Sequence, residues 1–154
     1  MGHVSVESIQ RGEGTAGSRM KFSVAFFGNE PLPKLLDYAE LAEMLGFEGV
    51  WFTDTQLVCR EVYVTLAACA GRTRHVSLGT GVTMPHTRHE SITASAFASL
   101  NEIAQGRVQL GISTGDNGLR TIGRPKARIA DLETYVGQLR RLLAGRSVDF
   151  EAGT

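Results

Sequence analysis

The 154-residue chain has little that would tie it to a disulfide scaffold, a membrane or a nucleic acid. Its two cysteines, Cys59 and Cys69, are too few and too isolated for a disulfide framework or a zinc site. We therefore expect reduced, packed thiols in a cytoplasmic protein. No apolar run reaches about 18 residues, which excludes a transmembrane helix. The 16 basic and 16 acidic residues form no like-charge block, so neither a nucleic acid nor a membrane is expected as a partner.

Two common site signals are also missing or weak. The glycines of GISTGDNG (111–118) lack the ordered G-x-G-x-x-G of a dinucleotide site, and no acidic residue follows at the required distance. This excludes a nicotinamide-binding Rossmann domain. His86, His89 and Glu90 could supply three metal ligands, but Pro85 argues against the regular helix that would align them. We expect no bound metal.

Residues 1–19 are small, polar and glycine-containing, with no apolar segment of a secretory signal. They predict a disordered leader, a misassigned start or a remnant of cloning, ahead of one domain over residues 20–154.

Apolar patterning after residue 20 predicts four strands, each followed by a helix. The expected strands are 21–27, 49–53, 75–84 and 107–113, and the expected helices are 35–45, 61–70, 92–103 and 132–143. We expect Pro31 and Pro33 to lie in the first loop. Strict alternation predicts an α/β fold with a parallel sheet and right-handed crossovers. A complete (βα)8 barrel needs about 250 residues, so four units could form at most half of one; that this is the N-terminal (βα)4 half of a TIM-type barrel is implied by the family resemblance described next.

Glycine and polar residues gather where the strands end. In α/β proteins ligands bind at the carboxyl ends of parallel strands, so chemistry is expected there. Residues 79–90 read GTGVTMPHTRHE, and residues 99–116 read SLNEIAQGRVQLGISTGD. These two segments resemble GxGVTNPxTRHP and TLDELSGGRxxLGIGxGD of the luciferase-like flavin and deazaflavin oxidoreductases. Within that family they are most similar to the methylene-tetrahydromethanopterin reductase branch, and the resemblance extends from Met20 to about Phe150.

The resemblance implies a cofactor-dependent oxidoreductase acting on a small molecule. The implied cofactor is coenzyme F-420 with hydride transfer, or FMN with molecular oxygen. The Gly81–Val82 bond is expected to be a cis peptide within a β-bulge that supports one face of the ring, with Thr80 and Thr83 beside it in the cofactor site. From the residues alone, a glycine-kinked strand is the favoured interpretation of this segment, and the resemblance reverses that preference.

Asp54, Thr55 and Asp116 complete the expected site. We expect Asp54 to bind the cofactor, with a turn or helix cap as the alternative. Thr55 stands where alcohol-oxidising relatives have histidine; its hydroxyl can exchange a hydrogen bond but cannot act as a base. Asp116 is expected to exchange a proton with the substrate or the ring, and the alternative is that Asp116 and Asn117 cap the following helix.

Some residues depart from the family pattern. Met84 replaces an asparagine, and we expect it beside the ring, where it would weaken hydrogen bonding to the cofactor. Arg88 and Arg107 are expected to hold loop carbonyls or carboxylates, with contact to a cofactor as the alternative. The other departures are Glu90 for proline, Asn101 for aspartate and Ser113 for glycine.

An alternative function follows from the open edges of a four-stranded sheet. The chain could be a non-catalytic half-barrel that assembles as a homo-oligomer or with a second half-barrel.

Overall fold

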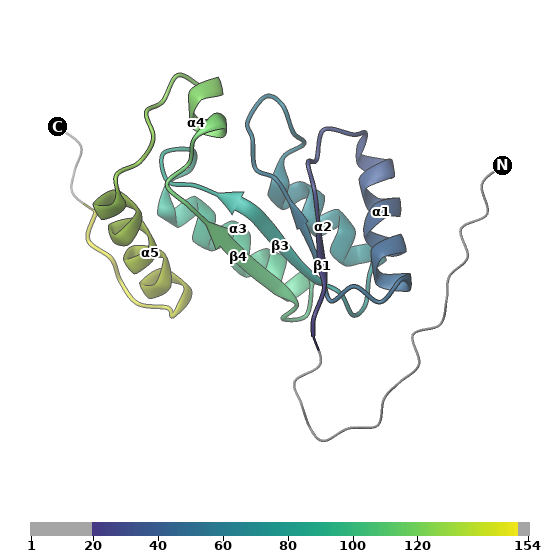
Figure 1. The fold of residues 1–154 in the computed structure, drawn as a ribbon. Helices are drawn as coiled ribbons and strands as arrows, with labels where there is room; N and C mark the ends of the chain where they lie inside the picture. The colour runs from purple at the N-terminus through teal and green to yellow at the C-terminus, as the bar shows by residue number, and fades with distance from the viewer. Residues whose placement is uncertain (1–19, 151–154) are drawn as a thin grey trace.

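The computed structural model describes residues 20–150, which form one parallel four-stranded sheet with helices packed against it (Figure 1). The strands are β1 (Ser23–Phe26), β2 (Gly49–Phe52), β3 (Ser77–Thr83) and β4 (Val108–Ile112), in the spatial order β1-β2-β3-β4. The helices are α1 (Leu32–Met44), α2 (Val62–Arg72), α3 (Glu90–Ile103), α4 (Asn117–Thr121) and α5 (Ile129–Leu143). The predicted four parallel βα units are confirmed.

One face of the sheet carries the main core. Alternate residues of a strand point to opposite faces, and the side chains of Val50, Phe52 and Leu78 are buried against α1, α2 and α3. Phe26 stacks on Tyr38 of α1, with ring centroids 5.1 Å apart. A second, smaller core joins α3 to α5 and to the outer face of β4, and its buried members are Ala94, Tyr135 and Leu139.

The opposite face of the sheet is lined by small residues around one indole. Trp51 lies across the neighbouring strands, because a Cβ atom placed on Gly79 would overlap its ring. A Cβ on Gly49 would lie 3.1 Å from its indole nitrogen and 2.6 Å from the hydroxyl of Ser23. Glycine at positions 49 and 79 therefore makes room for the only tryptophan of the chain.

The first helix begins earlier than expected. α1 starts at Leu32 with Pro31 as its N-cap, so Pro33 lies within the first turn instead of the loop. Proline is tolerated there because first-turn N–H groups have no partner within the helix.

Two other helix predictions need correction. α5 starts at Ile129, because the Asp131 carboxylate accepts hydrogen bonds from the backbone and side chain of Arg128. The five-residue α4 was not expected, since one turn is too short to show helical periodicity.

Within residues 20–150, no helix combines the length and apolar character needed to cross a bilayer.

Candidate functional site

The loops that follow the four strands lie together at one end of the sheet, at the top of Figure 1, with α4 beside them. Parallel strands deliver their carboxyl ends to the same edge, so residues far apart in sequence meet there. Asp54, Thr55, Thr83 and Asp116 all follow or end a strand at this edge.

The end of β3 is irregular as the resemblance implied. The Gly81–Val82 peptide bond is cis, and the register between β3 and β4 shifts between Thr80 and Thr83. The Thr80 hydroxyl donates to the Gly111 carbonyl (2.8 Å) and accepts from the Gly111 N–H (3.0 Å) across this irregularity. The Val82 side chain is partly exposed and passes close to Gly111. Thr80 therefore fixes the bulge, while Val82 faces solvent.

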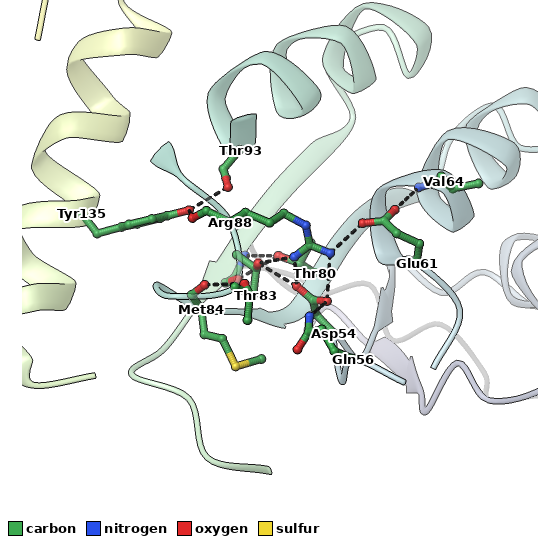
Figure 2. Close-up of polar contacts among 12 residues, drawn as sticks. Asp54, Gln56, Glu61, Val64, Thr80, Thr83, Met84, Arg88, Thr93 and Tyr135 are labelled. Atoms are coloured by element: carbon green, nitrogen blue, oxygen red, sulfur yellow. Dashed lines mark hydrogen bonds and ion pairs between the residues drawn. The ribbon is translucent and has the colours of Figure 1, made fainter. Parts of the chain in front are cut away.

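Asp54 is the centre of a buried polar network (Figure 2). Its side chain is only 4% exposed, and its two carboxylate oxygens accept four hydrogen bonds. Gln56 Nε2 donates at 2.7 Å, Thr83 Oγ1 at 2.8 Å, and the two terminal nitrogens of Arg88 at 2.6 and 3.2 Å. Asp54 serves neither as a simple turn residue nor as a helix cap. Its contact with a cofactor stays a prediction, and the carboxylate is committed to these donors.

Arg88 connects the second and third βα loops. Its guanidinium also donates to Glu61 Oε1 at 2.6 Å and lies 4.9 Å from the centre of the Tyr63 ring. The Glu61 carboxylate in turn accepts from the Val64 N–H at the start of α2. Burial would lower the pKa of Arg88, but the carboxylates of Asp54 and Glu61 outweigh it and raise that pKa. Arg88 therefore stays charged, and it holds carboxylates as expected.

The same network continues toward α5 through Tyr135. Tyr135 Oη lies 2.7 Å from Thr93 Oγ1 and donates to the Arg88 carbonyl at 3.1 Å (Figure 2). Burial raises the pKa of Tyr135 to about 12 and also raises the pKa of Tyr63. Both phenols are therefore neutral near pH 7. Tyr135 acts as a hydrogen-bonding group, whereas the buried Tyr63 hydroxyl has no hydrogen-bond partner within residues 20–150.

Met84 lies under the glycine loop that follows β4. Its side chain is buried, and a Cβ on Gly115 or Gly118 would approach its sulfur or terminal methyl within 3 Å. It packs beneath the loop that carries Asp116, together with Leu119. An apolar residue is suitable at position 84 because it packs against this loop. Contact between Met84 and the ring stays a prediction.

Thr55 and Asp116 differ in their relation to a cavity between the loops, because Thr55 lines it and Asp116 does not. Thr55 lines a cavity of about 390 Å³. The Asp116 side chain is 72% exposed, and its Oδ1 lies 3.0 Å from Arg120 Nη2. Asp116 is the N-cap residue of α4 by position, but its side chain makes no capping hydrogen bond. The carboxylate is thus available at the rim of the site, and its catalytic role stays a prediction.

Sequence reasoning missed several residues that line this cavity. Arg120 and Thr121 belong to the unexpected α4, whose existence could not be read from periodicity. Thr121 Oγ1 lies within 3.1 Å of the Gln56 carbonyl, which brings α4 against the loop after β2. The complete lining consists of Phe27, Thr55, Val58, Asn117, Arg120 and Thr121.

The two histidines of the loop after β3, His86 and His89, lie in a turn and at a helix cap. His89 is the N-cap of α3, and its Nδ1 accepts a hydrogen bond from the Ser91 N–H. His86 adopts a positive φ of 68° in the preceding turn. In residues 20–150, no three His, Cys, Asp or Glu side chains are grouped as metal ligands.

Both cysteines are free thiols. Cys69 is buried in the main core, and burial raises its pKa to about 12. Cys59 is half-buried, and its thiol donates to the Phe27 carbonyl at 2.6 Å. Burial also raises the pKa of Cys59, so neither thiol is activated as a nucleophile.

Comparison with known proteins places these features in a family. A model described as luciferase-like monooxygenase matches residues 3–154. A 5,10-methylenetetrahydromethanopterin reductase of Methanolobus tindarius is 47% identical over 97 residues, covering 63% of this chain and 29% of the reductase. These findings confirm the resemblance drawn from residues 79–90 and 99–116.

Solved structures show the same fold. The coenzyme F420 dependent tetrahydromethanopterin reductase of Methanopyrus kandleri matches with a TM-score of 0.78 and 25% identity, over 88% of this chain and 43% of that one. The oxygenating constituent of 3,6-diketocamphane monooxygenase from Pseudomonas putida, in complex with FMN, matches with a TM-score of 0.73 and 16% identity, over 87% of this chain and 42% of that one. This chain therefore spans less than half the length of the relatives it matches.

Proposed function

The chain belongs to the luciferase-like monooxygenase family, and we propose that it supplies the part of an oxidoreductase that holds a coenzyme F-420 or FMN ring. The observation that carries this proposal is the end of β3, where Gly81 and the exposed side chain of Val82 lie at the carboxyl edge of the sheet. Relatives named for F420 and for FMN share this fold.

The residues present fit a flat, largely apolar ring. Glycine at position 81 lets a planar ligand approach the backbone closely, and Val82 offers an apolar surface. A cavity of about 390 Å³, lined by residues that follow β1, β2 and β4, falls within the range of small-molecule sites. When bound, the ring would supply hydride transfer or, with molecular oxygen, monooxygenation.

The chain's own polar groups then have distinct roles. The Thr55 hydroxyl can exchange a hydrogen bond with a substrate in the cavity but has no capacity as a base near neutral pH. The exposed Asp116 carboxylate can exchange a proton with a substrate or the ring. Arg88 and Asp54 hold the loops after β2 and β3 in a fixed relation, which orients these groups.

Ring binding can be measured directly. F-420 and FMN are titrated separately into the chain, and quenching of ligand fluorescence is followed. We expect saturable binding that Val82→Glu weakens at least tenfold, because a charge would replace the apolar contact. Ile129→Glu, a similar change on an exposed residue of α5, should leave binding unchanged. Equal affinity for the two variants, or no saturable quenching of either ligand, would contradict the proposal.

We propose as a second candidate function that the chain assembles through its sheet. Among the described strands, β1 and β4 each pair with a neighbour on one side only. The helices of the main core pack on the other face of the sheet, so within residues 20–150 no helix of that core covers the face that carries Trp51. A second half-barrel, from another copy or another chain, would cover both. Light scattering should then give a discrete homo-oligomer, whereas a monomer at all concentrations would exclude self-assembly.

A further inference from the structure

The cavity beside Thr55 is a mixed apolar and cationic site. Phe27 and Val58 form an apolar wall, with 53% and 42% of their surface exposed. Thr55, Asn117 and Thr121 contribute hydroxyl and amide groups to the rest of the lining. Such a lining suits a small molecule with an apolar body and a polar end.

Arg120 is the only ionisable residue in this lining. Its guanidinium is 73% exposed and uses one nitrogen, Nη2, for Asp116 Oδ1 (3.0 Å) and Asn117 Oδ1 (3.3 Å). Within residues 20–150, its Nη1 and Nε atoms have no hydrogen-bond partner. A guanidinium can present two parallel N–H groups to a carboxylate or phosphate, and here most of its donors are available.

The existing ion pair is too weak to prevent such binding. Exposed pairs are typically worth about 0–1 kcal/mol, and both Arg120 and Asp116 are more than 70% exposed. A bidentate anion held in the cavity would therefore compete successfully with Asp116 for the guanidinium.

We propose that this cavity binds the anionic end of the substrate, a carboxylate or phosphate ester, through Arg120. The inference rests on the proposed function for the identity of that anion as substrate, while the binding itself is independent of the ring. Phe27 and Val58 contact the apolar body. Binding draws Arg120 away from Asp116 and so frees the Asp116 carboxylate when substrate is present.

Matched probes and variants test the anion site. Phenyl phosphate, benzoate and neutral benzyl alcohol are titrated into the chain, and the amide resonances of Thr55, Asn117 and Thr121 are followed by NMR. The variants are Arg120→Gln, Arg120→Lys and the control Arg124→Gln, which removes an exposed arginine outside the cavity lining. Thermal unfolding establishes that each variant is folded.

The proposal predicts a specific pattern. The two anions should shift the three amides saturably in the wild type and in Arg124→Gln. Arg120→Gln should lower the affinity for both anions at least tenfold. Arg120→Lys should retain part of the affinity, because lysine keeps the positive charge but lacks the two parallel N–H donors of the guanidinium. Benzyl alcohol should bind weakly and equally in all four proteins. Equal weakening by Arg120→Gln and Arg124→Gln, or anion shifts only outside the cavity, would overturn the proposal.

A second arm separates a substrate anion from the phosphate of a cofactor. FMN and riboflavin share a ring but differ in the phosphate, so both are titrated into the wild type and Arg120→Gln. We expect Arg120→Gln to change neither affinity. A loss confined to FMN would assign Arg120 to the cofactor phosphate and overturn the substrate assignment. If neither ring bound the wild type, the proposed function would fail, whereas the anion titration would still decide this inference.

Discussion

The two ends of the sheet are held together in different ways. At the amino end, charged side chains bind the backbone: the Glu43 carboxylate accepts three N–H groups from residues 74–76, at 2.7 to 3.0 Å. Arg107 lies at the same end and donates to backbone carbonyls, as expected from the sequence. Its carbonyl partners are Val76 (2.7 Å), Thr73 (3.1 Å) and Ala70 (3.4 Å).

At the carboxyl end, charged side chains bind one another. Arg88 joins Asp54 to Glu61, and these three residues come from two different βα loops. The contacts of Glu43 and Arg107 with backbone groups depend little on the identity of the residues they bind. The contacts of Arg88 with two carboxylates require particular side chains and so fix particular loops. The amino end therefore stabilises the fold, while the carboxyl end stabilises one arrangement of the loops that form the site.

The largest effect should come from breaking the carboxyl-end pair. Arg88→Met would leave the buried Asp54 carboxylate without its cation, and we expect a loss of about 3–5 kcal/mol in the free energy of unfolding. The double variant Asp54→Leu with Arg88→Met removes both charges and should recover most of that loss. Urea denaturation measures both. If the double variant were as unstable as the single one, the destabilisation could not be assigned to a stranded charge.

Breaking the amino end should cost less and leave the site intact. Arg107→Met removes the donor shared by three carbonyls that are partly reachable by water, so we expect a loss of about 2–3 kcal/mol. Hydrogen exchange should rise at residues 70–76 and stay unchanged in the loop containing Asp54. The Arg88→Met variant should show the reverse distribution. Faster hydrogen exchange at both ends of the sheet in both variants would contradict the claim that each set of contacts stabilises only its own end.

A substitution between the two ends tests the packing of the exposed face. Gly79→Ala would drive a methyl group into the Trp51 indole, and overpacking of this kind costs about 1–3 kcal/mol. The fluorescence of Trp51 should change with it, since this is the only tryptophan. Gly137→Ala in exposed α5 meets no neighbouring atom and should stabilise the protein by about 0.5–1 kcal/mol. Unchanged stability and fluorescence in Gly79→Ala would show that Trp51 is free to move.

The smallest effect concerns the exposed start of α5. The Arg128 side chain and N–H lower the pKa of Asp131 from 3.8 to about 2. Because the folded-state pKa is the lower one, this stabilisation is fully present above pH 3.8 and is lost as the pH falls through about 2. Asp131→Asn should therefore lower the melting temperature slightly at pH 6, and the difference from wild type should shrink on acidification. Asp149→Asn, an exposed residue outside this pair, should show no such pH dependence.

The sequence predicted the fold far better than it predicted the contacts of the site. The four strands and their parallel order followed from periodicity and alternation, whereas the cis bond at Gly81–Val82 was implied by the resemblance of residues 79–90 to the luciferase-like family. The Asp54–Arg88 pair joins residues 34 positions apart, and no spacing rule indicates which carboxylate a distant arginine meets. The packing of Met84 could not be predicted for the same reason, because it depends on a glycine loop from the next βα unit.

The hydrogen bond from Thr121 to the Gln56 carbonyl has a consequence for how the rim responds to a ligand. It links the fourth βα unit to the second across 65 residues without passing through β3. A ligand that displaces α4 would therefore also displace the loop after β2, because Thr121 is hydrogen-bonded to Gln56. The displacement would reach Arg88 through the hydrogen bonds of Gln56 and Arg88 with Asp54. The rim is expected to move as one body or not at all.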